Sequence, residues 1–228
     1  NFRQWGSKTA GHPEYGEAGG IEMTTGPLGQ GIASAVGMAI AERSMNSRYG
    51  DSLVDHRTWV IASDGDLMEG ISHEAGSLAG HMKLGRLIVL YDDNGISIDG
   101  STDISLSDDA LGRFEAYGWH AQRCNGHSPN ELSDAIDAAL SSGHPSIIAC
   151  RTTIGYGAPT KAGTSGSHGA PLGDEEIAST REALNWPHDP FVVPSEIISA
   201  WRVAGARGAK VRNEWNERLI NSDRRQEF

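Results

Sequence analysis

TWVIASDGDLMEGISHEAGSLAGHMKLGRLIVLYDDNG, residues 58–95, contains two short apolar runs that each end in an acidic turn. The runs at 58–62 and 87–91 read as β-strands, and the segment 71–84 between them reads as a helix. A strand–helix–strand unit of this kind is typical of a parallel sheet. Acidic and amide side chains placed just after buried strands do little for folding, so the two turns predict a ligand site at one edge of the sheet.

The rest of the chain continues the same alternation. Two further strands are expected at 119–123 and 146–150, and the strands at 58–62, 87–91 and 146–150 are expected to be central. Helices are predicted at 32–43, 71–84, 109–117 and 129–140. The sequence therefore predicts an α/β fold, with a doubly wound, mainly parallel sheet and helices on both faces.

Two segments fall outside this alternation. Residues 155–173 are rich in Gly, Ala, Pro, Ser and Thr and are too long for an ordinary connection, which predicts a functional or mobile loop. Residues 194–228 carry many charges and are expected to form one or two helices. We therefore divide the chain into a ligand-binding domain, 1–193, and a helical segment, 194–228, that leads away from it.

Composition excludes several classes of protein. The formal net charge of −11 over 228 residues argues against a nucleic-acid partner, because that binding relies on clustered Lys and Arg. The longest apolar run, 87–91, is far shorter than the roughly 20 residues of a membrane helix, so no membrane partner is expected. Cys124 and Cys150 lie in strand-like runs and are expected to be small buried residues of a reducing, cytoplasmic protein.

The two acidic turns contain a set of oxygen ligands. Asp64 can offer a carboxylate oxygen, Asn94 an amide oxygen and Ile96 a backbone carbonyl. Hard oxygen ligands suit magnesium or calcium, and magnesium usually completes its shell with water and phosphate oxygens. Gly65 lets the backbone approach such a phosphate at the start of a helix. The turns therefore predict a metal and a phosphate together.

Five ordered blocks carry a resemblance to a known family. They are GHPE at 11–14, TTGPLGQG at 24–31, GISHE at 70–74, DDNGISI at 92–98 and SHGAPLG at 167–173. Together with Asp64-Gly65 and the later Asn94, which look like a thiamine diphosphate-binding motif, they resemble the transketolase family over nearly the whole chain. That motif usually opens Gly-Asp-Gly and closes Asn-Asn, whereas here Ser63 and Asp93 take the outer positions. Ser63 is small enough to keep the turn, and Asp93 leaves Asn94 in place.

The resemblance implies cofactors and roles for individual residues. It implies thiamine diphosphate with Mg²⁺, or Ca²⁺ as the alternative metal, held by Asp64, Asn94 and the carbonyl of Ile96. The residues that it implies to contact the cofactor are Gly26, Pro27, Leu28, Gly65, Asn94 and His168. It further implies that His168 and His12 are catalytic, His168 near the diphosphate and substrate and His12 at the donor sugar.

The same resemblance implies an activity. Members transfer a two-carbon ketol unit from a ketose phosphate to an aldose phosphate in the pentose phosphate pathway, as cytoplasmic homodimers. The Glu on which that family depends to activate the cofactor belongs to a second domain of the partner subunit, and no block of this chain resembles that domain. Residues 1–193 are then the diphosphate- and magnesium-binding domain, lacking its earliest residues, and residues 194–228 are a helical linker toward the missing second domain. The isolated chain is expected to be inactive.

Three alternative readings remain open. Dihydroxyacetone synthase shares sequence motifs like GHPE and GPLGQG and uses formaldehyde as its acceptor substrate. An assay of acceptor aldehydes is needed to distinguish it from transketolase. A non-catalytic domain that kept the fold is the second. The third, a dinucleotide-binding loop at 26–31, is disfavoured because the glycine spacing does not match GxGxxG. His73 and His81 lack the spacing of a zinc site and are read as structural.

Overall fold

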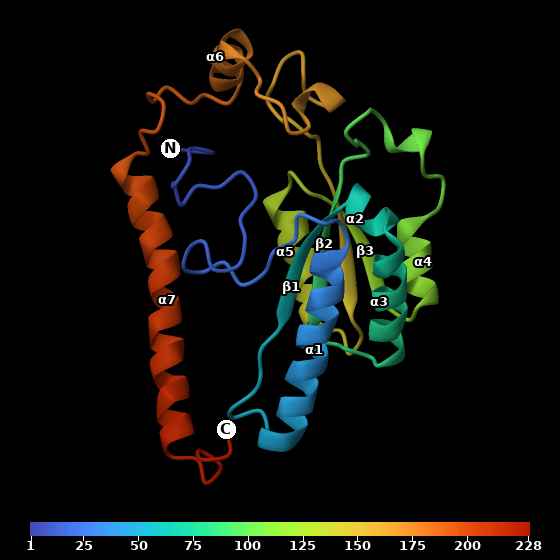
Figure 1. Cartoon of the computed structure of the whole chain (residues 1–228), viewed down its shortest axis with the longest axis vertical. Helices are drawn as coiled ribbons and strands as arrows, with labels where there is room; N and C mark the ends of the chain where they lie inside the picture. The colour runs from blue at the N-terminus through green and yellow to red at the C-terminus, as the bar shows by residue number, and fades with distance from the viewer.

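Four strands form one parallel sheet in the computed structural model, which describes residues 1–228 (Figure 1). The strands are β1 (Thr58–Ser63), β2 (Leu87–Asp93), β3 (His120–Asn125) and β4 (Ser146–Arg151). Their order across the sheet is β1-β2-β4-β3, and every neighbouring pair is parallel. All four lie where the sequence predicts strands, and the expected α/β class is confirmed.

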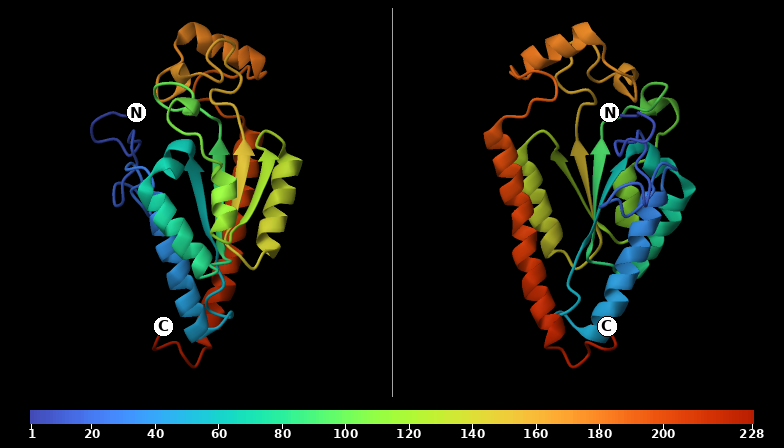
Figure 2. Two further views of the ribbon diagram at one scale, coloured as in Figure 1. Left: turned by 90° about the vertical axis from the view of Figure 1, so that its right-hand side faces the viewer. Right: turned by 60° about the vertical axis from the view of Figure 1, so that its left-hand side comes forward.

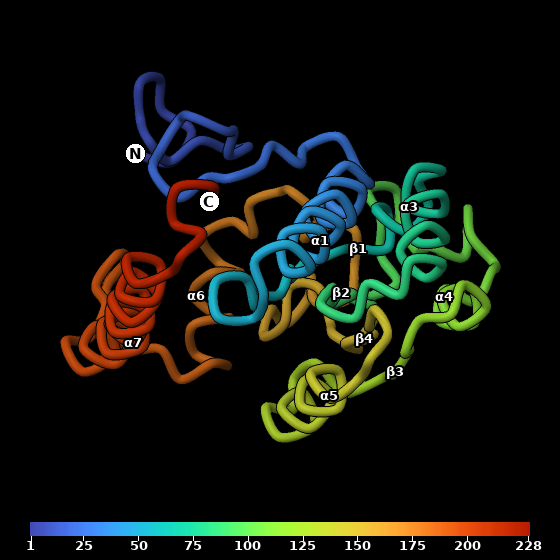
Figure 3. The backbone as a smooth tube through the Cα atoms, turned by 90° about the horizontal axis from the view of Figure 1, so that it is seen from below, coloured from blue at the N-terminus to red at the C-terminus, as the bar shows by residue number.

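Helices cover both faces of the sheet (Figure 3). The helices are α1 (Gln30–Tyr49), α2 (Asp64–Met68), α3 (Gly70–His81), α4 (Ala110–Ala116), α5 (Pro129–Ser141), α6 (Asp174–Ala183) and α7 (Ser195–Ile220), with short 3-10 turns η1 (Thr102–Ile104) and η2 (Ser165–Ser167). Helices α1, α3 and α4 pack on one face and α5 on the other. The sequence did not predict α2 or α6.

Side chains of the central strands alternate between two cores. Val89 and Ile147 pack toward α1 and α3, whereas Ile88 and Ile148 pack toward α5. All four are at most 1% exposed, which explains why β2 and β4 read as continuous apolar runs rather than as alternating ones. Burial on both faces is the structural form of the doubly wound sheet that the sequence predicts.

Strand β1 is an edge strand, and the prediction that it is central is wrong. Only β2 pairs with it, and its side chains Ile61 and Trp59 are 81% and 47% exposed. Val60 and Ala62, which point the other way, are buried in the core. An apolar run indicates strand structure, but the neighbours that cover each face come from distant parts of the chain.

The two cysteines lie side by side in the sheet. Cys124 of β3 is in register with Cys150 of β4, and their sulfur atoms are 4.0 Å apart as free thiols. Both are buried, as expected, and burial raises the pKa of Cys150 to about 12. A thiol in this state stays protonated, so Cys150 serves as a packing residue rather than as a nucleophile.

The long loop between β4 and α6 is tied to α6. The carboxylate of Glu176 accepts hydrogen bonds from the Thr160 amide at 2.7 Å, the Thr160 hydroxyl at 2.8 Å and the Lys161 amide at 3.0 Å. The ammonium group of Lys161 donates to the carbonyl of Leu172 at 2.8 Å. These bonds fold residues 155–173 back over the carboxyl ends of the strands (Figure 2).

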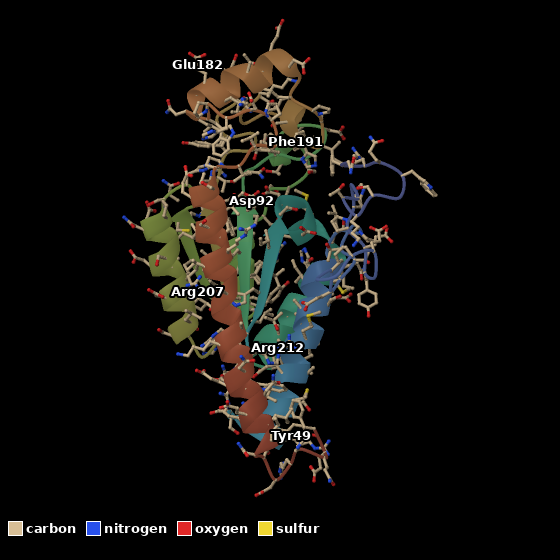
Figure 4. The ribbon with its side chains drawn as sticks, turned by 90° about the vertical axis from the view of Figure 1, so that its left-hand side faces the viewer. Tyr49, Asp92, Glu182, Phe191, Arg207 and Arg212 are labelled. Carbon is tan, nitrogen blue, oxygen red and sulfur yellow. The ribbon has the colours of Figure 1, made fainter.

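Helix α7 stands apart from the sheet (Figures 1 and 3). It contacts the rest of the domain near the carboxyl end of the helix. There the indole of Trp215 donates to the carbonyl of Leu53 at 2.8 Å. Tyr49, at the end of α1, packs edge-on against Phe228 with ring centroids 5.1 Å apart, close to the lower end of the molecule (Figure 4). Neither α7 nor any other helix combines the length and the apolar character needed to cross a bilayer.

Candidate functional site

The carboxyl ends of β1 and β2 bring the two acidic turns together. Ser63 at the end of β1 is in register with Asp92 at the end of β2, so Asp64 and Asn94 follow neighbouring strands. The amide of Gly95 donates to Oδ2 of Asp64 at 3.1 Å. The two acidic turns therefore lie close together, as the sequence predicts. Asp92 is labelled at this end of the sheet in Figure 4.

Asp64 is the most deeply buried member of the site. Its side chain lies in the first turn of α2, the residue is 4% exposed, and Oδ1 accepts a hydrogen bond from the Tyr91 hydroxyl at 2.6 Å. Burial raises the pKa of Asp64, while the bonds from Tyr91 and from the Gly95 amide oppose that shift. A carboxylate in such surroundings gains most from a bound cation, which replaces the hydration that it has lost.

Asn94 and Ile96 form a tight turn beside Asp64. Oδ1 of Asn94 accepts from the Ile96 amide at 2.9 Å, and its amide nitrogen donates to Asp92 at 3.1 Å. The carbonyl oxygen of Ile96 accepts no hydrogen bond. Asp64, Asn94 and Ile96 all line one cleft of about 860 Å³. The turn thus offers oxygen atoms toward the same space as the buried carboxylate.

These oxygen donors fit a magnesium ion. The chain has no group of three His, Cys, Asp or Glu side chains arranged to hold a metal. The predicted set differs from such a group because it combines one carboxylate, one amide oxygen and one backbone carbonyl. A set of few protein oxygens is what Mg²⁺ takes when waters and phosphate oxygens complete its octahedron. The donors at this cleft therefore suit a metal bound together with a phosphate ligand.

The glycine-rich loop, residues 26–31, lies against α2. The Gly29 amide donates to Oδ1 of Asp66 at 3.0 Å. A Cβ atom built on Gly65 would lie 3.1 Å from Cδ1 of Leu28, so glycine at this position leaves room for that side chain. The structure thus brings together Leu28 and Gly65, which the resemblance assigns to one cofactor.

The two predicted catalytic histidines differ in position. His12 is exposed, and its ring lies 4.0 Å from where a Cβ of Gly26 would be, beside the glycine-rich loop. His168 follows η2 in the long loop, is also exposed, and does not line the cleft of Asp64. The same loop reaches the cleft through Gly163. The chain therefore sets His12 beside the glycine-rich loop and leaves His168 outside the cleft of Asp64.

Two polar residues at the site escaped sequence reasoning. Tyr91 ends an apolar strand, where it reads as a core residue, yet its hydroxyl contacts Asp64. Burial, followed by the bond to Asp64, raises the pKa of Tyr91, so the phenol keeps its proton and acts as the donor. Asp66 reads as part of an acidic turn, yet it binds Gly29. Its place three residues after Ser63, in a capping box, is the one local signal for a structural role.

Basic residues also line the cleft and contact α2. Arg123 and Arg151 line the cleft, and Arg151 donates to Oδ1 of Asp93 at 3.0 Å. Arg113 donates to the carbonyl of Leu67 at 2.9 Å and contacts Nε2 of His73 at 3.1 Å. The contact with Arg113 gives His73 the structural role expected from the sequence.

Comparison with known proteins identifies the family. Residues 1–227 match the family model described as transketolase, thiamine diphosphate binding domain. A transketolase of Cereibacter sphaeroides is 60% identical over 228 residues, which are 100% of this chain and 35% of that protein.

Solved structures agree with this match. The crystal structure of transketolase from Campylobacter jejuni has a TM-score of 0.95 at 40% identity and covers 99% of this chain and 36% of that one. A Pichia stipitis transketolase in complex with sedoheptulose-7-phosphate has a TM-score of 0.91 at 41% identity, covering 96% and 33% of the two chains. The chain spans about a third of the length of these relatives. It belongs to the transketolase family, in the part described as the thiamine diphosphate binding domain.

Proposed function

We propose that this chain is the diphosphate- and metal-binding part of a transketolase, which transfers a two-carbon ketol unit from a ketose phosphate to an aldose phosphate. The observation that carries the proposal is the meeting of the buried Asp64 with the Asn94 turn beside the glycine-rich loop. A folded domain without a ligand has little use for a buried carboxylate that lines an open cleft. Membership of the transketolase family supports the same conclusion.

The residues of this chain would bind and orient the cofactor. Asp64, the Asn94 amide oxygen and the Ile96 carbonyl would hold Mg²⁺, or Ca²⁺ in its place, and Gly65 with Asn94 would contact the diphosphate. When bound, thiamine diphosphate supplies the electron sink that ketol transfer requires. The chain contributes position and charge, because a metal held in a buried place fixes the phosphate end of the ligand.

The glycine-rich loop would line the rest of the cofactor. Gly26, Pro27 and Leu28 belong to this loop, and Leu28, which lies against Gly65 of α2, is 48% exposed although it is apolar. An exposed leucine next to the predicted diphosphate site is suited to contact an apolar part of a ligand. This contact would exclude water from the reacting end of the cofactor.

The two histidines would act on the substrate. His12 lies beside Gly26, so it is near enough to the cofactor-lining loop to contact a donor sugar. His168 lies on the long loop between β4 and α6, and a movement of that loop would carry it toward the cleft. The sedoheptulose-7-phosphate bound by the Pichia stipitis relative supports sugar phosphates as the substrate class.

The intact protein is proposed to be a homodimer in the pentose phosphate pathway of the cytoplasm. Trp59 and Ile61, apolar side chains of a groove beside the glycine-rich loop, are 47% and 81% exposed, which supports burial against further protein. The free thiols of Cys124 and Cys150 support a reducing compartment. Residues 1–193 would bind the ligand, and α7 would lead toward the remaining domain.

Calorimetric titration of the intact protein tests the cofactor assignment. Thiamine diphosphate should bind in the presence of Mg²⁺ and much more weakly in its absence. Asp64→Ala should weaken binding of both by about 100-fold or more, because a direct ligand contributes at least as much as a partner that only orients one. Asp99→Ala is the matched control, since Asp99 is an exposed carboxylate on the loop that follows Asn94. Equal cofactor affinity in the wild type and in Asp64→Ala would overturn the proposed site.

A further inference from the structure

Both carboxylate oxygens of Asp66 are in use, and they bind two separate motifs. Oδ2 accepts from the Ser63 amide at 2.9 Å and from the Ser63 hydroxyl at 2.8 Å. Oδ1 accepts from the amide of Gly29 at 3.0 Å. Ser63 is the residue that departs from the usual Gly-Asp-Gly opening, so the departure comes with a partner for its hydroxyl. Asp66 thereby joins the end of β1 to the glycine-rich loop.

Gly29 is held tightly at the other end of this link. Its φ is 79°, and it caps the amino terminus of α1. A Cβ atom built on Gly29 would lie 2.8 Å from Cγ2 of Ile71 and 2.9 Å from Cβ of Glu69. The loop backbone therefore sits directly on the start of α3, where only glycine fits. A hydrogen bond to a carboxylate fixes that approach more firmly than packing alone.

Asp66 is separate from the predicted metal ligands. The cleft that Asp64, Asn94 and Ile96 line does not include Asp66, which lines a smaller groove together with Leu28. Its carboxylate oxygens face backbone amides and a hydroxyl rather than open space. Its geometry is that of a brace between two segments.

We propose that Asp66 is a positioning residue that fastens the glycine-rich loop to the helix carrying Asp64, so that both walls of the cofactor site are set before the ligand arrives. The inference rests on the proposed function for the identity of the ligand, whereas the fastening itself is a property of the fold. Setting the loop in advance strengthens binding, because the ligand does not have to order that segment. Ser63 assists by holding the second oxygen of Asp66 in place.

Hydrogen exchange of the intact protein without ligand tests the fastening. In Asp66→Ala the peptide containing residues 26–31 should exchange about 10-fold faster or more, since a charge-assisted bond is lost from Gly29. The peptide containing residues 87–93 of β2 serves as an internal control and should be unchanged. Ser63→Ala removes the hydroxyl bond to Oδ2 of Asp66 and leaves the Gly29 amide bonded to Oδ1. Its effect on the exchange rate of residues 26–31 should therefore be about 3-fold or less.

A second substitution guards against misfolding of the alanine variant. Asp66→Asn keeps the size of the side chain but has one acceptor oxygen instead of two. In one orientation of the new side chain the amide nitrogen faces the Gly29 amide, donor against donor, and in the other the Gly29 amide keeps an acceptor oxygen that has lost its negative charge. Asp66→Asn should therefore also speed exchange at residues 26–31. Unchanged exchange there in both Asp66 variants, or an equal increase in Ser63→Ala, would reduce Asp66 to a cap of α2 and overturn the inference.

Titration with thiamine diphosphate and Mg²⁺ then separates this inference from the proposed function. We expect both Asp66 variants to bind the cofactor about 10-fold more weakly than the wild type, the lower end of what outer partners contribute. Absence of binding by the wild type would overturn the proposed function and leave the exchange result to decide the fastening. Wild-type binding with unaltered affinity in both Asp66 variants would overturn the positioning role alone.

Discussion

The hydroxyl of Tyr91 lies 2.6 Å from Oδ1 of Asp64, and both residues are buried at the carboxyl end of the sheet. The second oxygen of Asp64 accepts from the backbone of Gly95, so the carboxylate is held from two sides. A carboxylate oriented in this way presents its remaining lone pairs to the cleft in one direction. In the proposed metal site, Tyr91 would do for Asp64 what outer hydrogen-bond partners do for metal ligands generally.

Tyr91→Phe should weaken metal binding while the fold is retained. The ring that packs in the core remains, but Oδ1 of Asp64 loses its donor, which costs about 1–3 kcal/mol when the acceptor is left buried. We expect the apparent affinity for Mg²⁺ in the presence of thiamine diphosphate to fall by about 10-fold, measured by calorimetry or by Mn²⁺ spectroscopy. Tyr117→Phe is the control, because Tyr117 packs against Phe114 far from Asp64. Equal metal affinity in wild type and Tyr91→Phe would contradict the assignment.

Glu176 should control the exposure of the long loop. The amide of Thr160, the main cause, and that of Lys161 lower the pKa of Glu176 through hydrogen bonds to its carboxylate. Glu176→Ala should therefore speed tryptic cleavage after Lys161 by severalfold in the intact protein. Glu175→Ala, an exposed neighbour on the same turn of α6, should cleave at the wild-type rate.

The same proteolysis measures the response of the loop to ligand. The glycines of residues 155–173 give its backbone many accessible states, and ordering these states has an entropic cost that bound ligand would offset. We expect thiamine diphosphate with Mg²⁺ to slow cleavage after Lys161 in the wild type. Identical rates with and without the two ligands would argue against a loop that closes on the cofactor.

Glu42 should make stability depend on pH. It is buried in α1 with its Oε1 3.4 Å from Nε of Arg86, and burial raises the pKa of Glu42 while the charge of Arg86 opposes the shift. The charges of His56 and Arg43 also lower the pKa of Glu42, and the charge of Asp55 raises it. The pKa of Glu42 in the folded protein lies above its ordinary value of 4.5. The contribution of the protonated Glu42 to the free energy of unfolding is therefore complete below pH 4.5, and it is lost as the pH rises through the folded-state pKa.

Glu42→Gln removes that titration. The variant should gain stability relative to the wild type as the pH rises from about 4 to about 7, measured by urea unfolding across that range. Glu115→Gln is the matched control, since Glu115 is an exposed carboxylate of α4 and is not among the groups that shift the pKa of Glu42. A constant difference between Glu42→Gln and the wild type at all pH values would contradict the prediction.

The isolated 228-residue chain should not catalyse ketol transfer. The catalytic Glu expected from a second domain has no counterpart in it, and exposed apolar residues such as Ile61 favour self-association. The measurement is an assay with a ketose phosphate and an aldose phosphate, before and after the remaining part of the protein is added as a separate polypeptide. Turnover by the chain alone would show that catalysis does not require the second domain.

The sequence by itself determined the strands, the main helices and the meeting of the two acidic turns at one edge of the sheet. Apolar runs ending in Asp64 and in Asn94 indicate the strand ends because burial and turn formation act over a few residues. Since parallel strands end at the same edge, their meeting followed from the topology alone. The motifs around Leu28 and Gly65 identified the family before any geometry was known.

Tertiary structure alone decided what depends on partners far along the chain. Tyr91 contacts Asp64 across 27 positions and Asp66 contacts Gly29 across 37, so no local pattern could reveal either bond. The edge position of β1 likewise depends on which strands pair, and an apolar run such as 58–62 has the same local signature at an edge as at a centre. Local sequence sets what each segment forms, whereas the packing of distant segments sets which polar groups meet, because hydrogen bonds act over about 3 Å in space and take no account of separation along the chain.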